Sequence, residues 1–189
     1  GPTVREFHTA MVLDDAGTLL VVGGRTSASG SSNTCRLFVP DGGVWLSTGA
    51  LTQSRGFHAA FEFDGGVYVV GGLNSTATYR DTWEVFADGG WTLGATTIPD
   101  GGRASLTAEP RGDGIVFLFG GHNATTTFAT GYLFDARTGL FAPEAVVIGE
   151  DAGRTGHTVT YSPTDDMIIV GGDLFPFEDG GAGTGSVVA

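Results

Sequence analysis

Short runs of apolar residues, separated by turns rich in glycine and aspartate, extend along the whole chain. Four of these runs lie at 19–22, 67–70, 115–119 and 167–170, and each ends in a pair of glycines. A run of this length between turn residues is typical of a strand. No segment shows the spacing of apolar residues that an amphipathic helix requires. The pattern therefore predicts an all-β protein.

The glycine pairs that close these runs recur about every fifty residues along the chain. They are Gly23-Gly24, Gly71-Gly72, Gly120-Gly121 and Gly171-Gly172. A fixed period of this length is typical of an array built from one repeated unit of supersecondary structure. Because a single unit cannot bury its apolar face alone, neighbouring units must stack against one another.

Each unit begins with an arginine that stands 16 to 18 residues before the glycine pair. These residues are Arg5, Arg55, Arg103 and Arg154. A histidine follows three residues later in three units, as His8, His58 and His157, whereas the third unit has Leu106 at that place. Because these residues recur at one place in successive units, we interpret them as structural hydrogen-bonding groups.

Two hairpins are predicted in each unit. The first two strands, a and b, flank a tight turn such as Asp64-Gly65-Gly66, and strand b ends in the glycine pair. Turns of this composition between short apolar runs are a strong hairpin signal. A loop rich in serine, threonine and asparagine then leads to strands c and d, and strand d carries Trp45, Trp91 or Phe141. Each unit therefore reads as a four-stranded antiparallel meander.

A unit of this length, with a leading arginine and histidine, a strand ending in Gly-Gly and a late tryptophan, resembles the kelch repeat. The resemblance covers essentially the whole chain and departs from the pattern at Leu106 and Phe141. It implies a β-propeller, in which each repeat forms one blade around a central channel. The blades are expected at about 3–50, 51–99, 100–149 and 150–189.

The fourth unit shows strands a and b and only the beginning of strand c. We therefore expect three complete blades and part of a fourth, belonging to a ring of about six or seven blades. The remaining blades would lie on further sequence or on another chain, which would also cover the open sheet edges. A compact four-bladed ring is the competing interpretation.

The charge of the chain excludes some partners. The net charge is −12, and all nine cationic residues are arginine. An acidic surface repels phosphate backbones and anionic membrane surfaces, so nucleic-acid binding is not expected. Membrane insertion is not expected either, because no apolar run approaches the roughly 18 residues of a membrane span. Cys35 is the only cysteine, which excludes an intrachain disulfide and CxxC metal motifs. No metal or cofactor is expected.

The loops between strands b and c are long and differ from one another, and such loops on a rigid frame tend to carry binding residues. The candidate binding residues in them are Arg25, Tyr79, Arg80, His122, Asn123, Phe175, Phe177, Glu178 and Asp179. The two phenylalanines either bind a partner or pack over the blade edge. Asn74 and Asn123 begin triplets of the N-glycosylation type, which also arise by chance in such loops. Together with the acidity, these triplets favour an extracytoplasmic or secreted location, and the compartment stays open.

These features favour a non-enzymatic module that binds a protein partner through its b–c loops and blade surfaces. One alternative is a carbohydrate-binding propeller, in which Tyr79 would stack on a sugar ring. Another is part of a copper-radical oxidase of the galactose-oxidase type, which also uses kelch-like blades. Such a site needs tyrosine, histidine and cysteine side chains together, and this chain offers four tyrosines, Cys35 and one histidine outside the repeat position, His122.

Overall fold

The computed structural model describes residues 3–27, 30–147, 153–162, 166–173 and 187–188. Every regular element in these ranges is a β-strand. The prediction of an all-β chain is therefore confirmed. Within the same ranges there is no helix of the length and apolar character that crossing a membrane requires.

The first and second sheets are four-stranded antiparallel meanders, in which the strands lie side by side in chain order. The first sheet contains β1 (Thr9–Val12), β2 (Leu19–Val22), β5 (Cys35–Val39) and β6 (Val44–Ser47). The second contains β7 (Ala59–Phe63), β8 (Gly66–Val70), β9 (Thr82–Ala87) and β10 (Gly90–Thr97). A small hairpin of β3 (Arg25–Ser27) and β4 (Gly30–Ser31) extends from the b–c loop of the first sheet.

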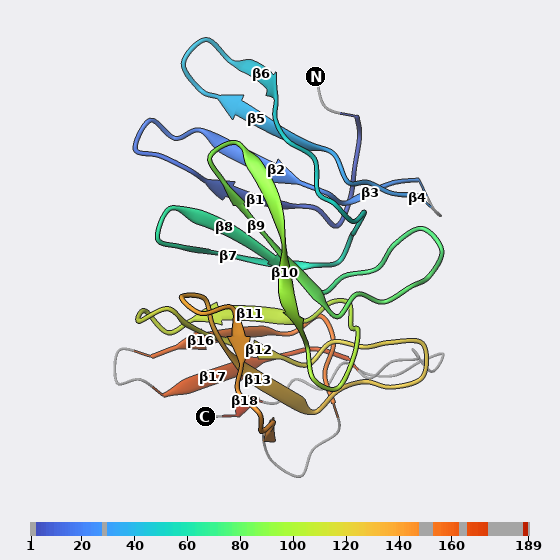
Figure 1. The fold of residues 1–189 in the computed structure, drawn as a ribbon. Coiled ribbons are helices and arrows are strands. Elements are labelled where there is room, and N and C mark those ends of the chain that lie inside the picture. Colours follow the sequence, from blue (N-terminus) through green and yellow to red (C-terminus); the bar gives the residue numbers. More distant parts are fainter. Residues whose placement is uncertain (1–2, 28–29, 148–152, 163–165, 174–186, 189) are drawn as a thin grey trace.

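The third sheet has the same antiparallel strand order, and the fourth sheet shows three described strands in that order. The third contains β11 (Thr107–Pro110), β12 (Ile115–Phe119), β13 (Thr130–Asp135) and β14 (Leu140–Phe141), and β15 (Val146–Val147) also pairs with β13. The fourth contains β16 (Thr158–Tyr161), β17 (Met167–Val170) and β18 (Val187–Val188). The sheets follow one another in chain order, from the blue first sheet to the red fourth (Figure 1).

The sheets pack as the blades of a β-propeller. The first strand of each sheet contacts the first strand of the next, so β1, β7, β11 and β16 form a series around the channel. Successive side chains of a strand point to opposite faces of its sheet. Both faces of an inner blade are covered, which explains why the b strands are apolar at every position rather than at alternate ones.

The hydrophobic core consequently lies between blades rather than inside one. Leu20 and Val22 of the first blade pack with Val67 and Val69 of the second. The next two interfaces are built in the same way, from Phe61 and Val70 against Val116 and Leu118, and from Phe117 and Phe119 against Val159 and Ile169. Each blade gains its stability from its neighbours, because burial of apolar side chains is the main favourable term in folding.

Candidate functional site

The repeated arginines fasten strand b to strand c within each blade. Arg55 Nη1 donates to the carbonyl oxygens of Gly71 at 2.8 Å and Thr82 at 3.0 Å. The equivalent bonds run from Arg5 to Gly23 and Thr34, from Arg103 to Gly120 and Thr130, and from Arg154 to Gly171. The arginines therefore satisfy backbone carbonyls at the point where the chain leaves the glycine pair.

The charge of Arg55 is balanced inside the blade. Its Nη2 lies 2.8 Å from Glu84 Oε1, and both side chains are fully buried. Glu84 also accepts hydrogen bonds from the backbone N–H groups of Thr52 and Gln53, at 2.6 and 3.2 Å. Burial lowers the pKa of Arg55, and the attraction of Glu84 opposes that shift. The network joins β9 to the segment that precedes Arg55.

The repeated histidines join neighbouring blades. His58 Nε2 is hydrogen-bonded to Thr9 Oγ1 of the preceding blade at 2.8 Å, and His157 Nε2 to Thr107 Oγ1 at 3.0 Å. Burial lowers the pKa of His58 to about 3 and that of His157 to about 4, so both are neutral at pH 7. The third blade has Leu106 at the histidine position.

The replacement of histidine by Leu106 is accompanied by a replacement of threonine on the neighbouring blade. The residue of the second blade that corresponds to Thr9 and Thr107 is Ala59, and Ala59 and Leu106 belong to the same buried apolar cluster. Between the second and third blades an apolar pair thus stands where the other two interfaces have a hydrogen-bonded pair. A single unpaired hydroxyl or imidazole would have been costly there.

A row of residues with left-handed backbone conformation links the four blades at one end of the strand series. Phe7, Phe57, Ser105 and Gly156 each lie two residues after a repeated arginine, and their φ angles are 54°, 57°, 55° and 69°. The N–H of each donates to the carbonyl of the one before it, at 3.0, 2.8 and 3.3 Å in turn. Positive φ is uncommon for phenylalanine, and backbone strain of this kind gathers at functional sites.

The residues that directly follow the glycine pairs lie beside this row. Each forms a β-bridge with the residue that follows the repeated arginine: Glu6 with Arg25, Gly56 with Leu73, Ala104 with His122, and Thr155 with Asp173. Together they line a cavity of about 350 Å³, which we call the channel-mouth pocket. Its lining residues are Arg25, Phe57, Leu73, Tyr79, Ala104, Ser105, His122, Thr155, Gly156 and Asp173.

The pocket combines charged, titratable and aromatic groups. The guanidinium of Arg25 lies over the Phe57 ring, 5.7 Å from its centre. His122 Nδ1 is hydrogen-bonded to Thr155 Oγ1 at 2.8 Å, and its ring meets the edge of Tyr79 at 5.7 Å between centres. Burial lowers the pKa of His122 and raises that of Tyr79, so both are uncharged at pH 7.

Two opposite charges in the pocket are available to a ligand. Over the described ranges, the Arg25 guanidinium has no hydrogen bond or ion pair, and neither has the carboxylate of Asp173. Both side chains are only partly exposed. A partly desolvated charge gains more from a ligand partner than one in open water.

The structure thus brings together three of the predicted binding residues, Arg25, Tyr79 and His122. Arg80 is not part of the lining, and its backbone joins Gly72 and Arg103 through hydrogen bonds of 2.8 and 3.1 Å. Asn123 Oδ1 accepts from the N–H groups of Thr125 and Thr126, which shapes its own loop. Asn74 Oδ1 does the same for Thr76 and Thr78. Phe175, Phe177, Glu178 and Asp179 lie outside the described residues.

Sequence reasoning missed Phe57, Leu73, Ser105, Thr155 and Asp173 as pocket residues. The repeat did contain a signal for these residues, because each one lies at a fixed number of residues from the repeated arginine or from the glycine pair. Their side chains share no chemistry, so only the stacking of blades reveals that they meet.

A metal-binding cluster is not found among the described residues, in which no group of three His, Cys, Asp or Glu side chains could hold an ion. Cys35 belongs to the core between the first and second blades, and burial raises the pKa of its thiol. It does not line the pocket that contains His122.

Comparison with known proteins gives a sequence relative and a structural neighbour. No protein-family model matches the chain. Over 104 residues the chain is 33% identical to tRNA wybutosine-synthesizing protein 4 of Emericella nidulans, which covers 51% of this chain and 10% of that protein. The chain superposes on the solved structure of YjhT with a TM-score of 0.77 and 18% identity, over 89% of this chain and 59% of that one. This likeness shows the propeller fold, and the chain spans only part of the length of either protein.

The sequence relative corrects one expectation. We expected a non-enzymatic module, and that expectation is contradicted by similarity to a protein named for the synthesis of wybutosine in tRNA. The repeat pattern reports the architecture of the blades, whereas function resides in the residues that the architecture brings together. The expectation was therefore drawn from features that carry no information on activity.

Proposed function

We propose that this chain is the kelch-type propeller section of an enzyme, and that the channel-mouth pocket binds the molecule on which the enzyme acts. The observation that carries the proposal is the convergence of one residue from each of four successive blades on a single pocket. Ligand sites often lie in concave, partly apolar pockets with a few convergent polar groups. The similarity to a wybutosine-synthesizing protein supports the enzymatic part of the proposal.

The lining favours a small ring-shaped anion as the ligand. Within the described ranges the Arg25 guanidinium contacts the Phe57 ring but has no hydrogen bond or ion pair, and guanidinium groups bind carboxylates in a two-pronged geometry. Phe57 and Tyr79 offer aromatic surface on which a ring can pack. The volume of about 350 Å³ suits a small molecule. Contact with a long phosphate backbone is disfavoured by the net charge of −12.

His122 is our candidate for proton transfer. It is neutral at pH 7 because burial lowers its pKa, and a neutral imidazole can accept a proton from a bound molecule. Its contact with Thr155 Oγ1 fixes the orientation of the ring. Asp173 contributes a carboxylate to the same cavity. Arg25 would then hold the ligand while His122 exchanges a proton with it.

We also propose that further blades flank these four in the functional protein. His8 and Thr158 are the counterparts of the residues that join blades elsewhere, and both are exposed. Apolar side chains are exposed on the same two outer blades, with Val12 at 57%, Trp45 at 37% and Val170 at 45%. A following or preceding blade, on the same chain or a partner chain, would cover them.

Saturation-transfer NMR tests the pocket. The probes are benzoate and cyclohexanecarboxylate, each compared with its neutral carboxamide. We expect the carboxylates to bind, the amides to bind more weakly, and Arg25→Gln to weaken carboxylate binding about tenfold or more. Arg137→Gln is the matched control, because it removes the same charge from an exposed turn outside the pocket. Equal binding by Arg25→Gln, or no carboxylate binding, would contradict the proposal.

A further inference from the structure

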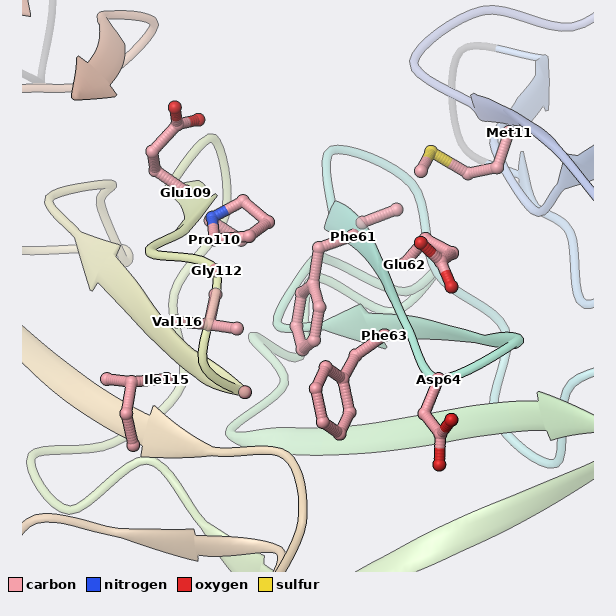
Figure 2. A pocket seen from close by; sticks show the side chains of 13 residues that line it. Met11, Phe61, Glu62, Phe63, Asp64, Glu109, Pro110, Gly112, Ile115 and Val116 are labelled. Carbon is pink, nitrogen blue, oxygen red and sulfur yellow. The ribbon is translucent and has the colours of Figure 1, made fainter. Parts of the chain in front are cut away.

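A second cavity, distinct from the channel-mouth pocket, lies where the a and b strands of the second and third blades meet their turns. Its volume is about 550 Å³. Phe61 and Phe63 of β7 lie beside each other, facing Ile115 and Val116 across the cavity, and Met11 of β1 approaches from the first blade (Figure 2). We call this cavity the turn-face groove. Its walls are apolar and come from three blades.

Carboxylates surround these apolar walls. Glu62, Asp64 and Glu109 line the groove, and no arginine or histidine is among its lining residues. In Figure 2 the three carboxylates lie around the phenylalanine rings rather than close to one another. One oxygen of Glu62 accepts the N–H of Gly65 at 2.9 Å, which leaves its other oxygen for a ligand.

The turn end of the molecule carries an excess of negative charge. Among the described residues, the aspartates in or next to its a–b and c–d turns are Asp14, Asp15, Asp41, Asp64, Asp88, Asp113, Asp135 and Asp166. The arginines of that end are Arg111 and Arg137, and Arg137 is paired with Asp135. By contrast, Arg5, Arg25, Arg55, Arg80, Arg103 and Arg154 lie at the end that carries the b–c loops.

The local structure of the turns explains why aspartate occurs at each position. The combined negative charge of these aspartates has a further effect. Asp14 Oδ1, for example, accepts the N–H of Thr18 at 2.9 Å, and Asp64 and Asp88 adopt positive φ. Because the sheets have the same strand order and pack through their first strands, their a–b and c–d turns emerge at one end and the charges add. A concave surface lined by one sign of charge concentrates oppositely charged partners.

We infer that the turn-face groove docks a basic polypeptide segment. A lysine or arginine side chain would lay its apolar stem along Phe63, which is partly exposed above the buried Phe61, and direct its cation to Glu62 or Glu109. A neighbouring apolar side chain would fill the space beside Ile115, which is also partly exposed. A metal ion does not suit this arrangement, because the carboxylates are spread around apolar walls and form no ion-binding group within the described residues. Nucleic acid is repelled by the same charges.

Fluorescence anisotropy with a labelled peptide of alternating lysine and leucine tests the inference. We expect saturable binding that weakens as the salt concentration rises from about 50 to about 300 mM, because screening shortens the reach of the charges. A peptide with glutamate in place of lysine should not bind. A peptide with alanine in place of leucine should bind more weakly, and equal binding would overturn the role of the apolar walls.

Charge-neutralising variants locate the site. The double variant Glu62→Gln with Glu109→Gln should weaken binding about five- to tenfold, because it removes two carboxylates and keeps their shape. Glu6→Gln with Glu144→Gln is the matched control, since both are exposed carboxylates outside the groove and should leave binding unchanged. Asp64→Asn is a further variant, because asparagine tolerates the positive φ of that position. Equal losses in the groove and control variants, or no peptide binding, would overturn the inference.

Discussion

At the scale of single residues, the histidine position of the repeat is paired with the preceding blade in two different ways. His58 and His157 reach a threonine hydroxyl on the preceding blade, whereas Leu106 packs with Ala59. Equivalent places in successive interfaces thus hold either a polar pair or an apolar pair, and the described blades contain no mixed pair. This is the result expected when a buried polar group costs more without its partner than the bonded pair contributes.

A double-mutant cycle at this position tests the pairing. Thr9→Ala and His58→Leu should each lower the free energy of unfolding by about 1–2 kcal/mol, because each leaves a polar group without its partner. The double variant recreates the pair found at Ala59 and Leu106. Its loss in the free energy of unfolding should therefore be clearly smaller than the sum of the losses in the two single variants. Urea unfolding measures all four proteins.

The control for the cycle is Thr160→Ala, an exposed substitution in β16. It should change the free energy of unfolding by less than about 0.5 kcal/mol. Strictly additive losses in Thr9→Ala and His58→Leu would show that the hydrogen bond between blades is not what couples these residues.

At the scale of strands and blades, the contacts between sheets make stability depend on pH. The pKa of His58 is about 3 and that of His157 about 4 in the folded protein, whereas an unfolded histidine has a pKa of about 6.5. Between these values the unfolded chain binds protons that the folded chain excludes. The stability that the two neutral histidines contribute is therefore complete above about pH 6.5 and is lost progressively as the pH falls below it.

Lowering the pH from 7 to 5 should accordingly reduce the free energy of unfolding by about 2 kcal/mol for each of these two histidines. The Thr9→Ala, His58→Leu double variant should lose about 2 kcal/mol less than the unaltered protein over the same pH change, because the contribution of His58 is gone. Urea titrations at both pH values provide the measurement. An unchanged pH dependence in the double variant would mean that His58 is not buried in its neutral form.

The strands of each blade could be predicted from the sequence, but the pocket could not be predicted in full. Runs such as Val67–Val70 before a glycine pair define a strand by local signals alone. Leu73 and Asp173 are unlike in chemistry and about one hundred residues apart, and only the stacking of blades makes them neighbours. Arg25 and His122 were found because charged and aromatic residues stand out in a loop, whereas Phe57 resembles the start of a strand.

At the scale of the whole molecule, the propeller has two unlike ends. The end with the b–c loops carries the channel-mouth pocket and most of the arginines, and the opposite end carries the acidic turn-face groove. All four blades give residues to the pocket, one from the first blade and three from each of the others, so any change in how blades stack would alter its shape. We therefore expect ligand binding and the packing of blades to depend on each other.

A crystal structure of the protein soaked with benzoate tests this account most directly. We predict electron density for the carboxylate against the Arg25 guanidinium, with the ring between Phe57 and Tyr79 and within reach of His122. Density for the same compound only at other places, with the channel-mouth pocket filled by water, would contradict the account.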